Sequence, residues 1–230
     1  MTVHVTVDST TGATTEIAID VLRAYNFGYA ARDQAGVQRH IAELRELGMP
    51  APSRLPAIFP VPAERVCTAT ELTVSGDDTY GEVEFALLNT EQGWLVTIAS
   101  DHTDLEVEKV NMPKAKASCP DIIGATAWLL DEVAEHWDDC TLHLWGQNHD
   151  GTEELIQSGT VGHLLAPADM QRVLAERSQT SLTPGTVILS GTLDGGPTPG
   201  KRAWRAELAD PHTGRTIQLG YSLHVLDQEL

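Results

Sequence analysis

The sequence predicts a β-rich α+β fold, in which strands outnumber helices. Apolar and polar residues alternate, as in half-buried strands, within residues 3–21 and 217–225. Two internal stretches, 80–88 and 93–100, are apolar enough for strands inside a sheet, and the second is apolar on both faces. No repeat, low-complexity tract or linker divides the sequence, so we expect one domain over residues 1–230.

The composition is typical of a soluble globular protein except for its charge. Hydrophobic residues make up 41% of the sequence and charged residues 21%, but the net charge is −18. This charge argues against nucleic acid or an anionic membrane as a partner. There is no secretory signal pattern, no apolar run long enough to span a bilayer, and no CxxC pair among the three cysteines. We therefore expect a cytoplasmic protein with reduced thiols.

From the amino end, residues 1–21 predict a β-hairpin whose turn is STTGATT. Residues 34–48 have apolar positions at helical spacing and end in glycine, which predicts a helix. The proline-rich stretch 49–62 predicts an extended segment. Strands are then expected at 64–74, 80–88 and 93–100.

Residues 120–138 are ambiguous, because IIGATAWLL favours a strand and DEVAEHWDD favours a helix. Residues 166–178 predict a second helix. The chain then shows a second predicted hairpin, with strands at 202–209 and 216–226 around the turn DPHTGR.

Two glutamates interrupt the predicted strand YGEVEFALL. Period-2 alternation places Glu82 and Glu84 on one face, with their Cα atoms roughly 6.5–7 Å apart. Asp101 follows directly on the apolar strand GWLVTIAS, at a strand end. Together they would form an all-oxygen site suited to Mg²⁺ or Mn²⁺. The alternative is a solvated face that holds no ion.

His40 and Glu43 lie one helical turn apart in HIAEL. A carboxylate beside an imidazole can orient it and raise its basicity, so that it abstracts a proton from water. The alternative is a chance pair on a surface helix.

Two other patterns do not predict a site. GGPTPGKR, at 195–202, has the spacing of a phosphate-binding loop but lacks its hydroxyl residue and a following helix. His136, His143 and His149 lack standard zinc spacing.

Residues 182–196, LTPGTVILSGTLDGG, resemble the signature of the fumarylacetoacetate hydrolase family. Further motifs of that family occur in the same order, and the resemblance covers roughly residues 22–196. These motifs are AYNFGYA, HIAE, the proline-rich LPAIFPVP, GEVEFALL, SDHTD, AKASCP and NHDG.

The resemblance implies that Glu82, Glu84 and Asp101 hold Mg²⁺ or Mn²⁺. The ion would chelate a small anionic α-keto or β-diketo acid and stabilise its enolate. In such a site the cation supplies the positive charge that this acidic chain lacks.

The resemblance also implies catalytic residues. Lys116, with Lys114 as the alternative, would bond the developing oxyanion. His40, oriented by Glu43, would activate the water that cleaves a carbon–carbon bond.

Asn26, Tyr29 and Thr192 would bind substrate, with Thr192 at the substrate carboxylate. The implied fold is a mixed β-sandwich roll, usually a homodimer. The resemblance therefore predicts a metal-dependent carbon–carbon hydrolase of acylpyruvate-type acids. A decarboxylase, tautomerase or hydratase on the same metal site is an alternative, as is an idle ligand-binding or scaffold protein.

Overall fold

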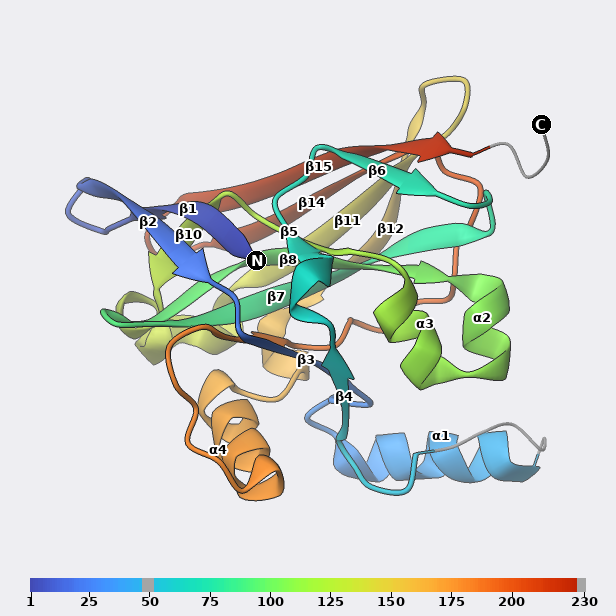
Figure 1. The fold of residues 1–230 in the computed structure, drawn as a ribbon, viewed down its shortest axis with the longest axis horizontal. Helices are drawn as coiled ribbons and strands as arrows, with labels where there is room; N and C mark the ends of the chain where they lie inside the picture. Colours follow the sequence, from blue (N-terminus) through green and yellow to red (C-terminus); the bar gives the residue numbers. More distant parts are fainter. Residues whose placement is uncertain (47–51, 227–230) are drawn as a thin grey trace.

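The computed structural model, which describes residues 1–46 and 52–226, contains two β-sheets packed one over the other (Figure 1). The larger sheet has the strand order β2 (Thr14–Asp20), β1 (Thr2–Asp8), β10 (Thr126–Leu129), β8 (Gly93–Asp104), β7 (Thr79–Thr90), β13 (Thr186–Leu189), β3 (Arg23–Gly28) and β4 (Ala57–Val61). β9 (Asp121–Ile123) pairs with β8 and with β5 (Val66–Cys67). The smaller sheet has the order β12 (Glu153–Thr160), β11 (Thr141–Gln147), β14 (Ala203–Asp210), β15 (Arg215–Val225) and β6 (Glu71–Val74). Because both sheets contain parallel and antiparallel pairs, the predicted β-rich fold with mixed sheets is confirmed.

Four α-helices surround these sheets in the described residues: α1 (Gln34–Glu46), α2 (Leu105–Val110), α3 (Met112–Ser118) and α4 (Pro167–Ser178). α1 and α4 lie beyond β3 and β4, on the side away from the smaller sheet (Figure 1). α2 and α3 follow directly on β8. None of the described helices combines the length and the apolar character that crossing a membrane requires.

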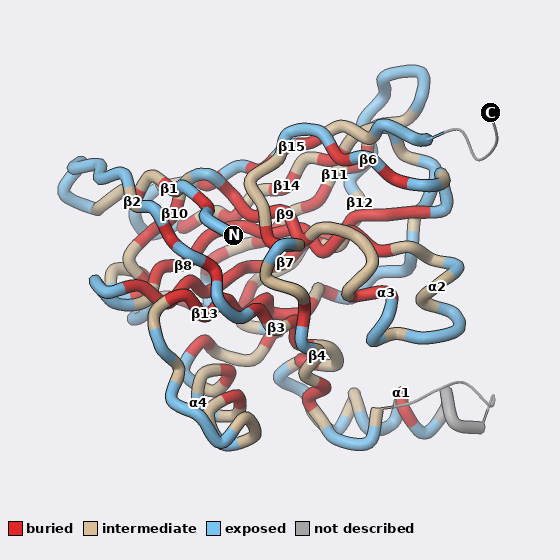
Figure 2. The backbone as a smooth tube through the Cα atoms, viewed as in Figure 1, coloured by how far each residue is buried: buried red, intermediate tan, exposed pale blue. Residues whose placement is uncertain are grey.

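The β7–β8 hairpin is the centre of the molecule and is buried along almost its whole length (Figure 2). On one face, Phe85 and Ile98 pack into the core shared with the smaller sheet. On the other face, Leu88 and Leu95 pack into a second core with the N-terminal hairpin. Burying such a side chain stabilises the fold by about 1.5–3 kcal/mol. Both faces of this hairpin are therefore apolar over the half nearest its turn.

Several predicted elements are confirmed. The N-terminal hairpin forms with Thr2 opposite Asp20, and the hairpin of β14 and β15 forms around the predicted turn. The predicted helices at 34–48 and 166–178 are α1 and α4, although residues 47 and 48 lie outside the described part. The described part of the proline-rich stretch contains β4, an edge strand, where a proline such as Pro60 is tolerated.

The prediction of one strand over 64–74 was wrong. A 3₁₀ turn (Ala63–Arg65) is followed by β5 and β6, and these two strands belong to different sheets. The ambiguous segment 120–138 contains β9, β10 and two 3₁₀ turns (Leu130–Glu132 and Ala134–Asp139). Apolar composition alone could not separate these short pieces.

The sequence did not predict β3, β12, α2 or α3. α2 begins where the Asp104 side chain accepts hydrogen bonds of 3.0 Å from the N–H groups of Glu106 and Val107. Such capping starts a helix too short to show apolar periodicity. α2 and α3 matter because they cover the acidic end of β7 and β8.

Candidate metal centre

Three carboxylates converge at the end of the β7–β8 hairpin away from its turn. Glu82 of β7 pairs in register with Asp101 of β8, and Glu84 lies two residues along on the same face. One ligand oxygen from each residue lies within 4.8 Å of the other two. Glu84 and Asp101 are only 0% and 1% exposed, and Glu82 is partly buried. This face of the hairpin is therefore not solvated.

Lys116 reaches these carboxylates from α3. Its Nζ donates a hydrogen bond of 2.6 Å to Glu82 Oε2 and another to Asp101 Oδ2. Burial alone would lower the pKa of Lys116, but Asp101, Glu82 and Glu84 together raise it well above its usual value, so the ammonium stays charged. Lys114 is exposed, so Lys116 is the lysine of this cluster.

Asn26 of β3 lies against the same carboxylates. Its Nδ2 donates to Asp101 Oδ2 at 3.0 Å and to Glu84 Oε1 at 3.4 Å. The backbone N–H of Gly191 lies close enough to Glu84 to favour its charged form and so lower its pKa. Gly191 has φ +77°, and a Cβ there would lie 2.4 Å from the carbonyl oxygen of Phe27, so only glycine fits. The signature stretch thus brings its backbone against the acids.

Asp121 is a fourth carboxylate that the sequence reasoning missed. It is the register partner of Asp101 across β8 and β9 and is 0% exposed. No N–H or hydroxyl donor among the described residues bonds either of its oxygens, and its carboxyl lies within hydrogen-bond reach of Asp101. Burial raises its pKa well above the usual value, and Asp101 and Glu84 add to the shift. The one signal in the sequence that could have indicated Asp121 is its place at the start of the apolar run DII, within the ambiguous segment 120–138.

The donor set fits a divalent cation. Burial raises the pKa of Glu82 and Glu84, and the neighbouring Asp101 raises both further, so a single lysine does not compensate these acids. Glu84 Oε2 and Asn26 Oδ1 are buried and lack a partner among the described residues. All the available donors are oxygens, which Mg²⁺ and Mn²⁺ prefer. The residues present could therefore hold such an ion.

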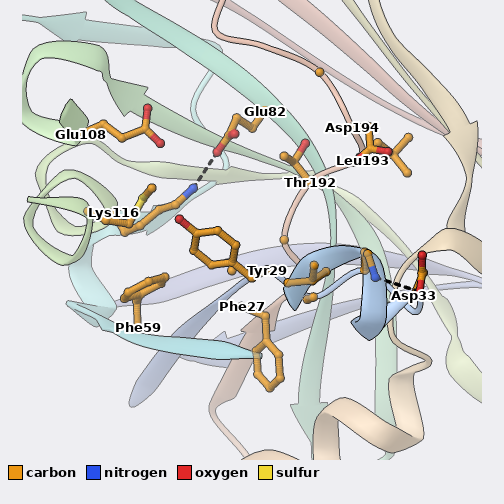
Figure 3. A pocket seen from close by; sticks show the side chains of 18 residues that line it. Phe27, Tyr29, Asp33, Phe59, Glu82, Glu108, Lys116, Thr192, Leu193 and Asp194 are labelled. Atoms are coloured by element: carbon orange, nitrogen blue, oxygen red, sulfur yellow. Dashed lines mark hydrogen bonds and ion pairs between the residues drawn. The ribbon is translucent and has the colours of Figure 1, made fainter. Parts of the chain in front are cut away.

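A cavity of about 550 Å³ borders the cluster (Figure 3). Glu82 and Lys116 form one wall, and Tyr29 lies beside them. Tyr29 has φ +54°, an uncommon backbone conformation for a residue other than glycine. Burial raises the pKa of its hydroxyl, and Glu108 of α2 adds to the rise, so the hydroxyl stays protonated.

Thr192 also lines this cavity, in the loop after β13. Its hydroxyl donates to the carbonyl oxygen of Val83 at 2.9 Å and accepts from Gln157 Nε2 at 2.9 Å. The hydroxyl hydrogen is thus used inside the protein. A contact with a substrate carboxylate remains a prediction.

His40 and Glu43 lie on α1, but their side chains are outside the described part of the structure. Gly36 and Val37, in the turn before His40, line the cavity. α1 therefore borders the same space as the acids, and the role of the His40–Glu43 pair remains a prediction.

The family model described as "Protein of unknown function (DUF2848)" matches residues 27–221. No curated protein matches the chain by sequence.

Solved structures share the fold at low identity. A crystal structure of Cg1458 is 16% identical with a TM-score of 0.62, over 94% of this chain and 83% of that chain. The apo form of 2-keto-3-deoxy-D-arabinonate dehydratase is 18% identical with a TM-score of 0.64, over 90% and 74% of the two chains. The same dehydratase complexed with magnesium and 2,5-dioxopentanoate has 17% identity and a TM-score of 0.61, over 90% and 75%. This likeness shows a common fold.

Proposed function

This chain belongs to the DUF2848 family of proteins of unknown function, and from its site we propose that it is a divalent-metal-dependent enzyme acting on small 2-keto acids. The observation that carries the proposal is that Glu82, Glu84 and Asp101 converge beside a cavity and are largely buried. Two oxygens among them and next to them, Glu84 Oε2 and Asn26 Oδ1, have no hydrogen-bond partner in the described residues. A dehydratase of similar fold was solved with magnesium and a keto acid, which supports it.

Glu82, Glu84 and Asp101 would hold Mg²⁺ or Mn²⁺, with Asn26 beside them. A bound divalent cation supplies a Lewis acid for the adjacent keto and carboxylate oxygens of such a substrate. The cluster would then face a small anionic keto acid, as the family resemblance implies.

Lys116, which donates hydrogen bonds to Glu82 and Asp101, would stabilise the negative charge that develops on the keto oxygen. Because its pKa is held well above the usual value, it acts as a fixed cation and not as a base. Tyr29 also remains a hydrogen-bond donor, because burial raises the pKa of its hydroxyl. Both side chains lie on the cavity wall next to Glu82 (Figure 3).

We assign Glu108 as the acceptor for the proton that leaves the carbon beside the keto group. It lies in the cavity, outside the proposed ligand set (Figure 3). Its carboxylate accepts a hydrogen bond from the Tyr80 hydroxyl, which orients it. Removal of this proton is common to dehydration, tautomerisation and related lyase reactions, so we propose a reaction of this type.

Carbon–carbon bond hydrolysis is the second candidate. The observation that favours it is that Gly36 and Val37 of α1 line the cavity, one turn before His40. In this case His40, oriented by Glu43, activates water, and Thr192 contacts the substrate. An idle scaffold of the same fold would show neither metal binding nor proton exchange.

The test uses chelator-treated protein and pyruvate as the probe. Titration calorimetry should show one Mg²⁺ or Mn²⁺ per chain in the wild type and none in Asp101→Asn. The exposed Asp77→Asn variant is the matched control and should bind as the wild type does.

Proton transfer is then followed by NMR, as exchange of the pyruvate methyl hydrogens in D₂O. We expect exchange that requires the metal and slows by about 100-fold in Glu108→Gln. Absence of metal binding in the wild type would exclude the proposal. Acylpyruvate cleavage that is lost in His40→Asn would select the hydrolase reading.

A further inference from the structure

The charged side chains of the cavity are almost all acidic. Among the described residues that line it, the carboxylates are Asp33, Glu82, Glu108 and Asp194, and the one cation is Lys116. Figure 3 shows Glu82, Glu108 and Lys116 together on one wall, and Asp33 and Asp194 on the opposite side. Among the described lining residues, the cavity thus has one wall with the lysine and a mouth at the exposed Asp33 and Asp194, where both charged lining side chains are acidic.

The positive charge of Lys116 is already compensated by carboxylates of the protein, so it would not stabilise a second anionic group on a substrate. The Lys116 side chain is 8% exposed and is already bonded to Glu82 and Asp101. A keto acid held at this wall would place its own carboxylate there, as the proposed function requires. Any further negative charge on the substrate would have to be compensated elsewhere.

The arginines near the mouth are also paired. Arg39 lies 3.7 Å from Asp33, in the first turns of α1. Arg32 forms a fork with Asp138, with N–O distances of 2.6 and 2.7 Å. Arg32 lines a neighbouring cavity of about 570 Å³, which shares Asp33 and Asp194 with the first. A longer substrate would therefore pass Asp194, which has no ion pair among the described residues, and Asp33, whose charge the exposed Arg39 offsets only in part at 3.7 Å. Beyond them, the Arg32 guanidinium is already bonded to Asp138.

We propose that this site selects 2-keto acids that carry one carboxylate and an uncharged, hydroxyl-bearing remote end, and that it rejects dicarboxylates. The inference rests on the proposed function, since it takes the keto acid to bind at the Lys116 wall. Carboxylates at the mouth accept hydrogen bonds from hydroxyl groups and repel a second anion. Because the mouth acids are exposed, this repulsion is partly screened and falls with salt.

The test compares two probes of equal chain length, 2-oxoglutarate and 5-hydroxy-2-oxopentanoate, with pyruvate as the common core. Binding to the Mg²⁺-saturated wild type is measured by titration calorimetry at low salt. We expect pyruvate to bind, and the hydroxy compound to bind at least about tenfold more tightly than the dicarboxylate. The ratio should shrink when the salt concentration is raised.

The double variant Asp33→Asn/Asp194→Asn should bring this ratio close to one, chiefly by strengthening 2-oxoglutarate binding. Its control is Glu91→Gln/Glu135→Gln, which removes the same charge from exposed positions that do not line the cavity and should keep the ratio. If pyruvate binds and 2-oxoglutarate binds as tightly as the hydroxy compound, the inference is overturned and the proposed function stands. If pyruvate does not bind with Mg²⁺ present, the proposed function fails and the inference falls with it.

Discussion

The two faces of β8 carry opposite kinds of polar chemistry at adjacent residues. Asp101 faces Glu82, Glu84 and Lys116, where ionised groups predominate. Its neighbours Ser100 and His102 point to the other face. There, Ser100 Oγ and His102 Nδ1 lie 2.9 and 3.0 Å from the hydroxyl of Tyr221, between the two sheets.

The second face is a neutral network. Burial lowers the pKa of His102 to about 3, so the imidazole is uncharged at neutral pH. Burial likewise raises the pKa of Tyr221, which keeps its hydroxyl proton. This network leaves His102 Nε2 as its one polar atom without a partner in the described residues.

The charged face differs because it is incomplete. Glu84 Oε2, Asn26 Oδ1 and both oxygens of Asp121 accept no hydrogen bond from an N–H or hydroxyl donor among the described residues. Buried polar atoms without partners are costly, and proteins keep them where a ligand supplies the missing contacts. One strand therefore supports a neutral contact on one face, in which only His102 Nε2 lacks a partner among the described residues, and a site with several unsatisfied oxygens on the other.

The largest effect should come from Lys116→Met, which leaves the buried carboxylates without their cation. We expect the free energy of unfolding to fall by about 3–5 kcal/mol in chelator at pH 8. Added Mg²⁺ should restore part of it, because a bound cation compensates the same charges. Urea unfolding with and without Mg²⁺ measures both effects.

Lys114→Met is the matched control, since Lys114 is exposed on the same helix. Its unfolding free energy should stay within about 0.5 kcal/mol of the wild type. Equal losses in the two variants would contradict the assignment of Lys116 to the charged face.

Glu84→Gln should weaken metal binding on the charged face and leave the neutral face of β8 unchanged. The change removes one ligand charge and keeps the size of the side chain, so we expect metal affinity to fall about 100-fold, or about 2.7 kcal/mol. Stability in chelator should stay the same or rise, because repulsion among the acids is relieved. Calorimetric titration of Mn²⁺ beside the wild type measures the loss, and unchanged affinity would remove Glu84 from the site.

Tyr221→Phe should break the neutral face alone. Ser100 and His102 would lose their shared partner, so we expect a loss of about 1–3 kcal/mol in the free energy of unfolding. Metal affinity should not change. A loss of metal binding in this variant would show that the two faces are coupled through β8, and the comparison would fail.

The last prediction is the pH dependence that His102 imposes on the free energy of unfolding. Its folded-state pKa of about 3 lies below the usual value near 6.5, so the unfolded state binds the extra proton between these values. Stability from this residue is therefore present above about pH 6.5 and is lost by about 1.4 kcal/mol per pH unit as the pH falls. His102→Gln should lack this component, and urea midpoints of both proteins between pH 4.5 and 7.5 test it. If the urea midpoints of the two proteins changed with pH in the same way, the assigned role of His102 would be contradicted.

The sequence predicted the strands whose side chains alternate or are apolar on both faces, because burial imposes that pattern directly. It predicted the Glu82–Glu84 pair for the same reason. It could not choose between Lys114 and Lys116, because both lie on α3, a helix of only seven residues. Asp121 was missed because its position depends on the pairing of β8 with β9. These strands are separated in the sequence by α2 and α3, so no local pattern predicts that they pair. The sequence thus failed to predict the pairing of strands that are distant in the chain and the helices that are too short to show apolar periodicity.

The register of the β7–β8 hairpin also implies an order of assembly. Its turn joins Thr90 to Gly93 at the apolar end, whereas Glu82 and Asp101 meet near the other end. If the hairpin closes from its turn, the apolar pairs form before the two carboxylates approach each other. We therefore expect charge at Glu82 to change the rate of unfolding and to leave the rate of folding unaltered. The chemistry of this hairpin would then be free to vary at one end without slowing the folding that starts at the other.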